Sequence, residues 1–558
     1  MQNRMSWLVK GLAVAGFAGG LLVLFGLSSK PADSASEAAV SGIVKTNDGK
    51  ALRGAVVTVT AGSKSISRFT DQAGQYSISG LQPGNYSVAA TAWGYERKSD
   101  TKGLSGKTDM SFQLAPSWQP GRLSSAEWYG SLPVNEETTK LEYGCMGCHN
   151  GSEIVRHKGS TADEWKSTVQ SMGLDVLNEH EQASPRKQAL EWLPVLEKYF
   201  GPNSPVPTKE NVKQPEINDA VLRATFREYS TPNTSFVHSI TVDPVTQQVY
   251  FVEIDRASNA IGRLDIRSEE MKEYRFDTDF SQPHNPVVAP DGKVWVSLNN
   301  SKTVGLFDPE TEKVSEFPVV AVGHTIDVDW KGNIWESGPG VFKYDPRTGK
   351  SQQYFLPKPA DGTVAPGSSI GVMATDLAPA TGAICGTYDL AVGLKDDIWF
   401  TCSGPGYIGK LNSETKKIKL FRIPNAGAMK GVTVDPDGNV YFSSFSDHKL
   451  GRIDAKTEEV KLYQPPTAHA GLYGILVDRY TGDIWASDYE GSHITRFNPK
   501  TAAFIEYPLP RTDAMPRFMG QDAQGRIWYT EWRGKIGVLD PGDTSGHQMT
   551  KIIRASRQ

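Results

Sequence analysis

The sequence predicts a mainly β protein with three folded parts: a small β-sandwich, a short α-helical domain and a seven-bladed β-propeller. Three observations predict this fold class. The chain has 558 residues, far more than one ordinary domain. Its 54 glycines and 34 prolines are typical of folds with many short strands and turns. A strand–turn–strand unit of about 40 residues recurs along the C-terminal part, as in propellers and repeat arrays.

The chain opens with a segment typical of an export signal. Arg4 and Lys10 precede an apolar run over residues 11–27, GLAVAGFAGGLLVLFGL. The run fits either a cleaved signal, with Ser36-Glu37-Ala38 as a small-x-small cleavage site, or a retained membrane anchor. No cysteine directly follows the run, which excludes a lipid anchor. We therefore expect residues 1–38 to be a signal peptide or an inner-membrane anchor, and the rest of the chain to be periplasmic or otherwise extracytoplasmic.

The composition narrows the range of partners. Hydrophobic residues make up 38% of the chain and charged residues 22%, which is a globular profile. The formal net charge of -4 leaves no basic field for a phosphate backbone, so we expect no nucleic-acid partner. Four cysteines are too few for a disulfide scaffold.

Residues 40–116 alternate apolar and polar positions, as in VSGIV, AVVTVTA and QYSISG, with turn residues between the runs. Through GIVKTNDGKALRGAVVTV and TDQAGQYSISGLQPGNYSVAATAWGY, the segment resembles the carboxypeptidase regulatory-like family. The resemblance implies a transthyretin-like β-sandwich with a structural or adhesive role and no catalytic residues. We expect Gly74 and Gly84 to lie in tight turns with positive φ, and Tyr76 and Tyr86 to face the core.

Residues 117–207 combine helix-forming stretches with the sharpest motif of the chain. ADEWKSTVQSM and PRKQALEWLPVLEKYFG repeat apolar residues at three- and four-residue spacing. Ahead of them stands Cys145-Met146-Gly147-Cys148-His149, the C-x-x-C-H signature of covalent haem c attachment. Two thiols at this spacing reach the two vinyl groups of one porphyrin, and the adjacent histidine faces the iron. The alternatives, a redox dithiol or half of a zinc site, lack a surrounding βαβ pattern and a second C-x-x-C pair.

The sixth iron ligand is open between three residues: Met172, His157 and His180. The run TADEWKSTVQSMG followed by LEKYFGP resembles the small cytochrome c domains of haem-containing dehydrogenases, in which a downstream methionine is commonly the far ligand. The resemblance favours Met172, so that His149 and Met172 hold the iron. In the alternative, Met172 is a core methionine on the helix face of Trp165 and Val169.

Residues 212–558 contain the repeat. Each unit has an apolar strand, a turn with Gly or Asp, and a second strand with Trp or Tyr, as in VTVDPDGNVYFSS. The unit recurs seven times, and a spare fourth strand, TFREYS, precedes the first, so we expect it to complete the last blade. In the alternative, the tail after Asp540 supplies that last strand. With elements such as IWYTEWRGKIGVLDP, the repeat resembles the virginiamycin B lyase (streptogramin lyase) family and, more distantly, gluconolactonase-type propellers. We expect the blade cores to hold Trp295, Trp335, Trp399, Trp485 and Trp528.

Chemistry is expected at one mouth of the central channel, where each innermost strand begins and the next strand ends. The innermost strands begin with His238, His284, His324, Tyr388, Lys430, Tyr473 and Arg517. The second strands end with Glu253, Leu298, Gly338, Cys402, Ser444, Asp488 and Glu531. The three neighbouring imidazoles either converge on one metal ion or act as base and acid, with Glu253 close to His238. In the alternative, the three histidines are only the polar lining of a water-filled channel. Lys430 and Arg517 either bind an acidic ligand or pair with Asp488 and Glu531.

The lyase resemblance implies a site in a late blade, with a histidine and a glutamate of one blade, a histidine of the blade before, and an assisting magnesium ion. The corresponding positions here are Arg517, Glu531 and Tyr473, of which only the glutamate matches. The alternative is a rotated site in which three histidines and a glutamate carry similar chemistry, with a divalent ion such as magnesium in the channel. Those residues are His238, His284, His324 and Glu253.

Cys385 and Cys402 fall on paired strands of one blade, so an oxidising compartment favours a disulfide between them. The alternative is a thiolate metal ligand near His324. The stretch 358–384, rich in Gly, Ala and Pro, is a long insertion that we expect to form a lid or an interaction loop.

Three functions follow from these observations. The preferred one is an exported c-type haem protein, an electron carrier or oxidoreductase whose propeller receives a small-molecule substrate or a redox partner protein. The second is a virginiamycin B lyase-like carbon–oxygen lyase with metal-assisted elimination, in which the cytochrome segment is accessory. The third is a non-catalytic module that binds carbohydrate or protein.

Overall fold

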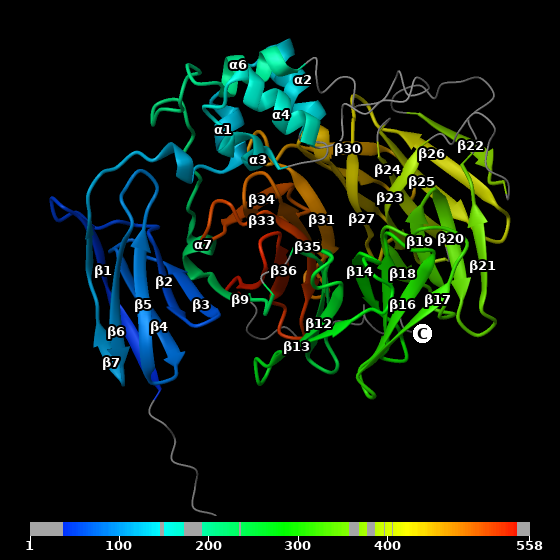
Figure 1. The fold of residues 1–558 in the computed structure, drawn as a ribbon, viewed down its shortest axis with the longest axis horizontal. Coiled ribbons are helices and arrows are strands. Elements are labelled where there is room, and N and C mark those ends of the chain that lie inside the picture. The colour runs from blue at the N-terminus through cyan, green and yellow to red at the C-terminus, as the bar shows by residue number, and fades with distance from the viewer. Residues whose placement is uncertain are drawn as a thin grey trace, which may run out of the picture.

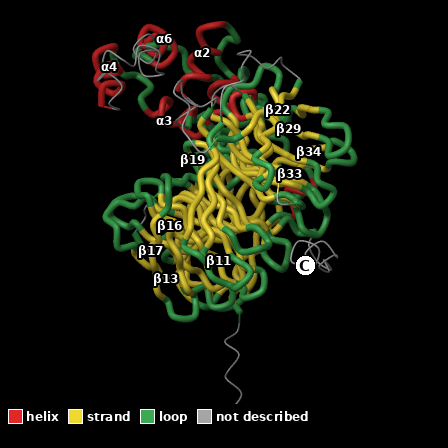
Figure 2. The backbone as a smooth tube through the Cα atoms, turned by 90° about the vertical axis from the view of Figure 1, so that its right-hand side faces the viewer, coloured by secondary structure: helices red, strands yellow, loops and turns green. Residues whose placement is uncertain are grey.

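Strands dominate the structure, a computed structural model that describes residues 37–145, 150–171, 192–233, 236–356, 368–375, 385–395, 397–403 and 406–543. Three parts follow one another along the chain, as Figure 1 shows: a sandwich in blue, a helical segment in cyan, and a propeller from green to red. The helices gather at one end of the molecule (Figure 2), and the sandwich stands beside the propeller (Figure 1). The predicted mainly β fold class is confirmed.

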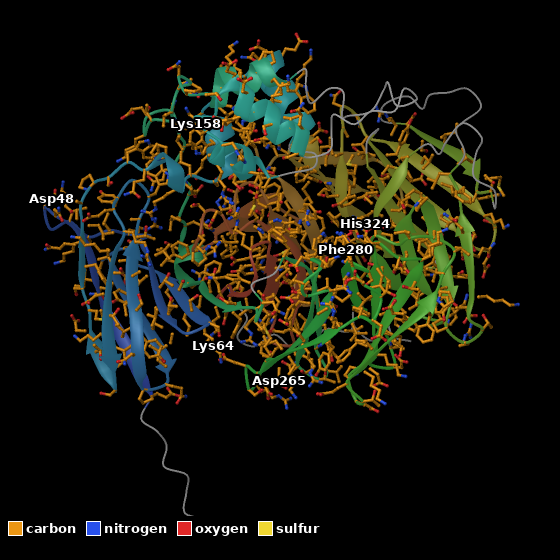
Figure 3. The ribbon with its side chains drawn as sticks, viewed as in Figure 1. Asp48, Lys64, Lys158, Asp265, Phe280 and His324 are labelled. Carbon is orange, nitrogen blue, oxygen red and sulfur yellow. A yellow bond between two sulfur atoms is a disulfide. The ribbon has the colours of Figure 1, made fainter. Side chains whose placement is uncertain are left out.

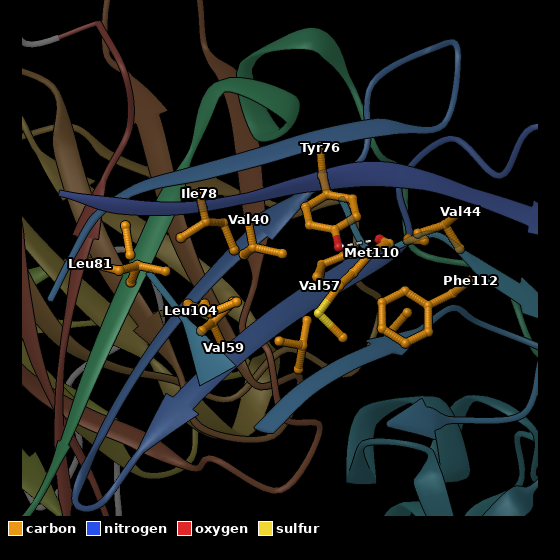
Figure 4. Packing of buried hydrophobic residues seen from close by; sticks show 14 of the residues in the cluster. Val40, Val44, Val57, Val59, Tyr76, Ile78, Leu81, Leu104, Met110 and Phe112 are labelled. Carbon is orange, nitrogen blue, oxygen red and sulfur yellow. Dashed lines mark hydrogen bonds between the residues drawn. The ribbon is translucent and has the colours of Figure 1, made fainter. Parts of the chain in front are cut away.

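The sandwich packs two sheets face to face. One sheet has the strand order β4-β1-β7, with β8 also paired to β1, and the other has the order β3-β2-β5-β6. Every second residue of β1 is buried, and aliphatic side chains such as Val40, Val57 and Ile78 fill the space between the sheets (Figure 4). The strands are β1 (Ala38–Thr46), β2 (Val56–Ala61), β3 (Lys64–Phe69), β4 (Gln75–Leu81), β5 (Gly84–Thr91), β6 (Lys98–Leu104), β7 (Lys107–Asp109) and β8 (Phe112–Leu114).

The tyrosines and glycines singled out in the sandwich differ in their surroundings. Tyr76 is buried as expected, and its hydroxyl donates to a backbone carbonyl at 2.5 Å (Figure 4). Tyr86 lies at the edge of the core, with its hydroxyl bonded to a carbonyl at 2.8 Å. Gly74 has a φ of 73°, as a tight turn requires. The expectation of positive φ at Gly84 is wrong, because this residue opens strand β5 and pairs with β6.

The segment between sandwich and propeller is helical and has a small core of its own. Trp165 and Val169 are buried on one face of α4, as their spacing predicts. Among the described residues no helix is long and apolar enough to span a membrane, and the run 11–27 lies outside them. The predicted helical character is confirmed, whereas nothing in these helices identifies a cytochrome fold. The helices are α1 (Ser125–Gly130), α2 (Glu136–Cys145), α3 (Gly151–Arg156), α4 (Ala162–Ser171) and α6 (Leu193–Phe200), with η1 (Pro120–Arg122) before them and α7 (Asp219–Arg223) after them.

Seven four-stranded blades form the propeller within the described residues. The innermost strand of each blade contacts that of the next, and β35 contacts β10, so the ring is closed. The blades are, in order, β10 (Val237–Asp243), β11 (Gln248–Glu253), β12 (Ala260–Asp265) and β13 (Met271–Arg275); β14 (Pro283–Val288), β15 (Val294–Leu298), β16 (Thr303–Asp308) and β17 (Lys313–Pro318); β18 (Ile326–Val328), β19 (Ile334–Gly338), β20 (Gly340–Asp345) and β21 (Lys350–Tyr354); β23 (Gly386–Val392), β24 (Asp397–Ser403), β25 (Tyr407–Asn412) and β26 (Lys417–Arg422); β27 (Met429–Val434), β28 (Val440–Ser444), β29 (Lys449–Ile453) and β30 (Val460–Tyr463); β31 (Leu472–Val477), β32 (Ile484–Asp488), β33 (His493–Asn498) and β34 (Ala503–Pro508); and β35 (Pro516–Gln521), β36 (Ile527–Glu531) and β37 (Lys535–Asp540), completed by β9 (Thr225–Ser230).

Strand β9, the TFREYS segment, closes the ring as predicted. One edge pairs with β37 and completes blade 7. The other edge pairs with β3 of the sandwich, so one continuous sheet of eight strands runs from blade 7 into the sandwich. The carboxylate of Glu228 on β9 is buried there, accepts a hydrogen bond from Ser65 at 3.0 Å and lies 3.3 Å from the ammonium of Lys535. Backbone hydrogen bonds therefore join propeller and sandwich directly.

The predicted disulfide and the predicted blade-core tryptophans are confirmed, whereas the structure describes only part of the predicted insertion. Cys385 and Cys402 form a disulfide, with Cα atoms 5.5 Å apart, so neither sulfur is a free thiolate ligand. In the insertion, β22 (Ser369–Met373) adds a fifth strand to blade 4 by pairing with β26, and the remainder lies outside the described residues. The predicted blade-core tryptophans are at most 7% exposed: Trp295, Trp335, Trp399, Trp485 and Trp528.

A glycine in the third strand of several blades faces an aromatic ring in the second strand. Gly451 pairs directly with Phe442, and a Cβ on this glycine would lie 2.1 Å from the ring. The close approach explains why the repeat carries glycine in segments such as IGRLD, IGKLN and LGRID, because any side chain there would displace the ring. The same pairing recurs for Gly262 with Phe251, Gly409 with Phe400, and Gly537 with Tyr529.

Replacing Gly451 with alanine is expected to destabilise the propeller by about 1–3 kcal/mol, because the methyl group overpacks the ring of Phe442. Gly371 on β22 is the matched control, since a Cβ there meets no atom within 4 Å and its φ is not positive. The midpoint of thermal unfolding should fall for Gly451→Ala and stay close to the wild-type value for Gly371→Ala. Equal midpoints for the two variants would contradict this account of the repeat.

Candidate functional site

The seven residues predicted at the channel mouth are neighbours in a closed circle, which we call the inner ring. The rings of His238 and His284 lie 3.6 Å apart between centroids, those of His284 and His324 4.1 Å, and those of His324 and Tyr388 4.3 Å. Figure 3 shows His324 inside the propeller. The circle continues through a cationic side, described below, and returns to His238 through Trp532, whose ring lies 6.0 Å away.

A bulge at the start of the innermost strand turns these side chains into the channel. In blade 1 the register between β10 and β11 shifts between Val237 and Ile240, so His238 lies in an extra segment with no opposite partner. A bulge of this kind bends the strand and re-aims a side chain. The register also shifts beside five other ring residues: His284, Tyr388, Lys430, Tyr473 and Arg517.

The three imidazoles are tied to one another through the backbone. Nδ1 of His238 lies 2.9 Å from the carbonyl oxygen of His284, and Nδ1 of His284 lies 2.8 Å from that of His324. Nδ1 of His324 in turn lies 2.7 Å from the carbonyl oxygen of Tyr388. A carbonyl oxygen only accepts, so each Nδ1 carries the proton and each Nε2 keeps a lone pair. The result is an arc of uniformly oriented imidazoles along one side of the channel.

The histidines of the arc are neutral over the physiological range. Burial lowers the pKa of His238 and His284 well below 6.5, and neighbouring imidazoles and Arg517 lower it further. Burial also lowers the pKa of His324 to about 3, although its hydrogen bond to the Tyr388 carbonyl opposes the change. The planes of neighbouring rings are tilted by 39° and 47°, and among the described residues the three histidines do not bring three ligand atoms within 4.8 Å of one another. The three Nε2 lone pairs of the arc therefore lie side by side and do not converge on one metal position.

The opposite side of the inner ring is cationic and aromatic. The Lys430 ammonium lies 4.0 Å from the ring centroid of Tyr388 and 5.6 Å from that of Tyr473, and the hydroxyls of these two tyrosines hydrogen-bond to each other. The Arg517 guanidinium lies 4.7 Å from the Tyr473 centroid and 4.2 Å from that of Trp532. Nε of Arg517 is buried and has no hydrogen-bond partner among the described residues. Neutral imidazoles and two cations thus face one space, which favours an anionic ligand.

The two glutamates predicted as site residues, Glu253 beside His238 and Glu531 at the position of the lyase-family glutamate, lie outside the arc. Glu253 pairs across the strands with Val237, and the bulge separates it from His238, which shares no hydrogen bond with it in the described chain. Burial, and after it the charge of Glu253, raises the pKa of Glu273 to about 7. Burial and the neighbouring Glu228 raise the pKa of Glu531, whose carboxylate lies 3.8 Å from the guanidinium of Arg511. The structure therefore joins neither glutamate to the arc.

The helical segment docks onto the propeller beside the inner ring. The Asn150 amide donates to the carbonyl oxygen of Tyr489 at 2.5 Å, and the Tyr489 ring lies 5.5 Å from that of Tyr473. Glu490, next in sequence, accepts hydrogen bonds from the Gly151 N–H at 2.8 Å and from the hydroxyl of Ser125. Burial raises the pKa of Glu490 to about 8. A buried carboxyl group that is protonated at neutral pH thus anchors α1 and α3 to blade 6.

The C-x-x-C-H motif begins at the end of α2, close to this docking contact. Cys145 is the last residue of α2, whereas Cys148, His149, Met172 and His180 lie outside the described residues. His157, an alternative ligand, caps α3 and stacks on Trp165 with centroids 5.6 Å apart. The described flanks of the motif, α2 and Asn150, both contact the propeller. The haem prediction itself remains a prediction.

Two family profiles match parts of the chain. The profile of the carboxypeptidase regulatory-like domain matches residues 39–115, and that of the virginiamycin B lyase family matches residues 372–551. Both resemblances inferred from the sequence are confirmed for these segments. Neither match covers residues 117–207, the segment of the haem motif. A comparison with curated proteins finds no match.

Solved structures similar to this chain include propellers of the lyase family. Selenomethionine-substituted virginiamycin B lyase from Staphylococcus aureus aligns at 21% identity and a TM-score of 0.47, covering 57% of this chain and 99% of its own. A streptogramin B lyase structure aligns at 23% identity and a TM-score of 0.48, covering 58% of this chain and 99% of its own. A catalytically inactive virginiamycin B lyase from Staphylococcus aureus with quinupristin aligns at 21% identity and a TM-score of 0.48, over 57% and 99%.

Replacing Glu490 with glutamine should change the pH dependence of stability. The pKa of this carboxyl rises from its ordinary value of 4.5 to about 8 on folding, so the folded state holds a proton that the unfolded state releases between these values. Wild-type stability therefore falls as the pH rises through this window, and Glu490→Gln removes that loss, by up to about 4 kcal/mol at pH 8.

Urea unfolding of both proteins at pH 5 and pH 8 measures the effect. The stability of Glu490→Gln relative to the wild type should increase between the two pH values. A difference that stays constant from pH 5 to pH 8 would show that Glu490 is ionised in the folded protein.

Proposed function

We propose that the inner ring is the active site of a carbon–oxygen lyase acting on a small molecule that carries or develops negative charge. The observation that carries the proposal is the arc of neutral imidazoles facing Arg517 and Lys430 across one channel mouth. The family match over residues 372–551 supports lyase chemistry at the level of the family.

The chemistry proposed is an elimination from an ester. A base removes the proton from the carbon next to a carbonyl group, and that electron pair forms a C=C double bond. The C–O bond at the following carbon breaks, and its electrons leave with a carboxylate. A histidine of the arc takes the proton at Nε2, and Arg517 and Lys430 stabilise the negative charge that develops. An imidazole with a pKa near 3 is a weak base, but an anion bound against the arc opposes the burial penalty and raises that pKa.

The site is rotated relative to that implied by the lyase family. Arg517 and Tyr473 stand where the family has histidines, and Glu531 faces Glu228. A channel magnesium ion does not fit the inner ring, because this hard cation prefers oxygen ligands and the ring offers imidazole nitrogens beside two cations. The two cations take the charge-stabilising role in this proposal. The substrate of the family is therefore not carried over to this chain.

The lyase proposal is tested with the full chain on quinupristin, the ligand named for a related structure, and on a panel of small cyclic esters. Elimination creates a C=C bond that absorbs in the ultraviolet and leaves the total mass unchanged, whereas hydrolysis adds one water. Arg517→Gln should lower turnover by roughly 100-fold or more, because the developing anion loses a charged donor. His284→Gln and His324→Gln should lower it as well.

His493→Gln is the control, since His493 is a buried histidine beside Asp488 and outside the inner ring. Its turnover should stay near the wild-type value. Full activity in a protein that carries both His284→Gln and His324→Gln would exclude the arc as the active site. Products that have gained water, or no turnover on any ester, would exclude a lyase.

A second candidate function is electron transfer by covalently bound haem c, and the sequence Cys145-Met146-Gly147-Cys148-His149 favours it. Cys145 and Cys148 would attach the porphyrin and His149 and Met172 would hold the iron, which supplies one-electron chemistry. The described flanks of this motif contact the propeller beside the inner ring, which supports an exchange of electrons with a substrate or partner protein bound there. Attachment of haem c also requires an extracytoplasmic location, either periplasmic or held at the inner membrane.

The haem proposal predicts a red protein whose colour survives denaturation and acid extraction. A pyridine haemochrome spectrum should show covalent haem in the wild type and none in Cys145→Ala/Cys148→Ala. The disulfide variant Cys385→Ser/Cys402→Ser is the matched control and should keep its haem. Met172→Ala should remove the red-end band of the oxidised spectrum, which His157→Ala should retain. Complete extraction of the colour by acid would rule out thioether attachment.

A further inference from the structure

A second cluster of metal-ligating side chains lies outside the inner ring, where α2 meets blades 5 and 6. Glu142 comes from α2, His448 follows the 3-10 turn η2 (Phe445–Asp447) after β28, and His469 precedes β31. One carboxylate oxygen and one nitrogen of each imidazole lie within 4.8 Å of one another. In the part of the chain that the structure describes, no other three His, Cys, Asp or Glu residues meet this condition.

The donor atoms lie slightly closer together than the ligands of a first coordination shell. Oε1 of Glu142 lies 2.9 Å from Nε2 of His448 and 2.6 Å from Nδ1 of His469. Bond lengths of about 2.0–2.2 Å in a tetrahedral zinc site place neighbouring donors about 3.3 Å apart. A small opening of the cluster therefore admits a cation between donors that already face one another.

His448 is oriented by a second hydrogen bond. Its Nδ1 lies 3.1 Å from the carbonyl oxygen of Ala470, so Nδ1–H donates and Nε2 faces the cluster. Histidine ligands of metals typically donate their other ring N–H to a carbonyl or carboxylate group in this way. The side chains of Glu142, His448 and His469 are 11%, 14% and 20% exposed, so the cluster is partly buried and keeps an opening for a further ligand such as water.

Protons hold the cluster together in the absence of a cation. Glu142 Oε1 accepts from both imidazoles, and His448 donates from both ring nitrogens, which makes it a cation. Burial would raise the pKa of Glu142, but the two histidines outweigh it and lower the pKa to about 2. The hydrogen bond to Glu142 outweighs the effect of burial on His448 and raises its pKa. A bound divalent ion would release the Nε2 proton of His448 to solvent and shift the Nδ1 proton of His469 to its Nε2, so that two metal charges replace the one charge of the protonated histidine.

We propose that Glu142, His448 and His469 bind a zinc-class divalent cation that fastens α2 to the propeller. Two imidazole nitrogens and one carboxylate oxygen suit zinc, whereas calcium and magnesium prefer sites made of oxygen alone. The three ligands come from segments that adjoin only through docking, so the ion stabilises the contact between the helical segment and blades 5 and 6. The three ligands belong neither to the inner ring nor to the residues that would hold haem, and the site depends on neither proposed function.

Zinc binding to the full chain tests the proposal. Protein treated with a chelator and then titrated calorimetrically with zinc chloride should bind the ion with micromolar or tighter affinity, and its thermal unfolding midpoint should rise. Glu142→Gln keeps the size of the side chain and removes its charge, and should weaken zinc affinity by more than about tenfold. His469→Gln should do the same, whereas His493→Gln should bind zinc like the wild type.

Two further measurements separate a metal site from an ion-pair cluster. Cobalt loaded in place of zinc should give an X-ray absorption spectrum with imidazole in its first shell, and this readout serves if a variant fails to fold. Circular dichroism of each variant without metal checks its fold. Wild-type protein that takes up no zinc, or equal affinities in wild type, Glu142→Gln and His469→Gln, would reduce the cluster to an ion pair that docks α2.

Discussion

The pairing of β9 with two different partners is the constraint on which the arrangement of the whole molecule depends. One edge completes blade 7 and the other edge extends the sandwich sheet. In this way blade 7 gains its fourth strand, and the sandwich is fixed to the propeller by the same kind of hydrogen-bond ladder that holds a sheet together. The helical segment lies between these two parts in sequence. Its path starts at β8, in one sheet of the sandwich, and ends at β9, in the sheet that joins the sandwich to blade 7. Further contacts to blades 5 and 6 hold it over the propeller.

At the channel mouth, a small shift of register between the first two strands of a blade creates the candidate site within a repetitive fold. In a regular antiparallel pair, alternate side chains go to opposite faces of a blade. The bulge beside His238, Tyr388 or Arg517 interrupts that alternation and brings one side chain per blade into the channel. The bulge recurs beside six of the seven ring residues, all but His324, so side chains of different chemistry meet at one mouth while the blades keep their core. Site and core are therefore separate, as in other folds that carry different functional sites on one framework.

The repeat in the sequence was sufficient to predict the seven blades and the seven residues of the inner ring. Segments such as TFREYS and the strands around each tryptophan repeat often enough to assign their places in the blades. The position of Glu253 was not predictable, because a bulge of one or two residues decides whether it meets His238. The cluster of Glu142 with His469 was equally hidden, since 327 residues separate them and no local pattern links a helix to a propeller loop. The docking carboxyl of Glu490 has no sequence signal either, because its pKa depends on burial by another part of the chain.

The double pairing of β9 also bears on how the chain reaches its native state. During synthesis or export from the N-terminus, β9 follows the sandwich and precedes every complete blade, while β35–β37 come last. The edge of β3 is then available as a template for β9 long before blade 7 exists. Because β9 is then already hydrogen-bonded to β3 on one edge, that edge is protected from pairing with other chains. Its other edge is held in place for pairing with β37 when blade 7 forms. The sandwich carries no candidate catalytic group, but its pairing with β9 assists the folding of the propeller. Without the sandwich, the outer edge of β9 would be exposed and free to pair with other chains in aggregates.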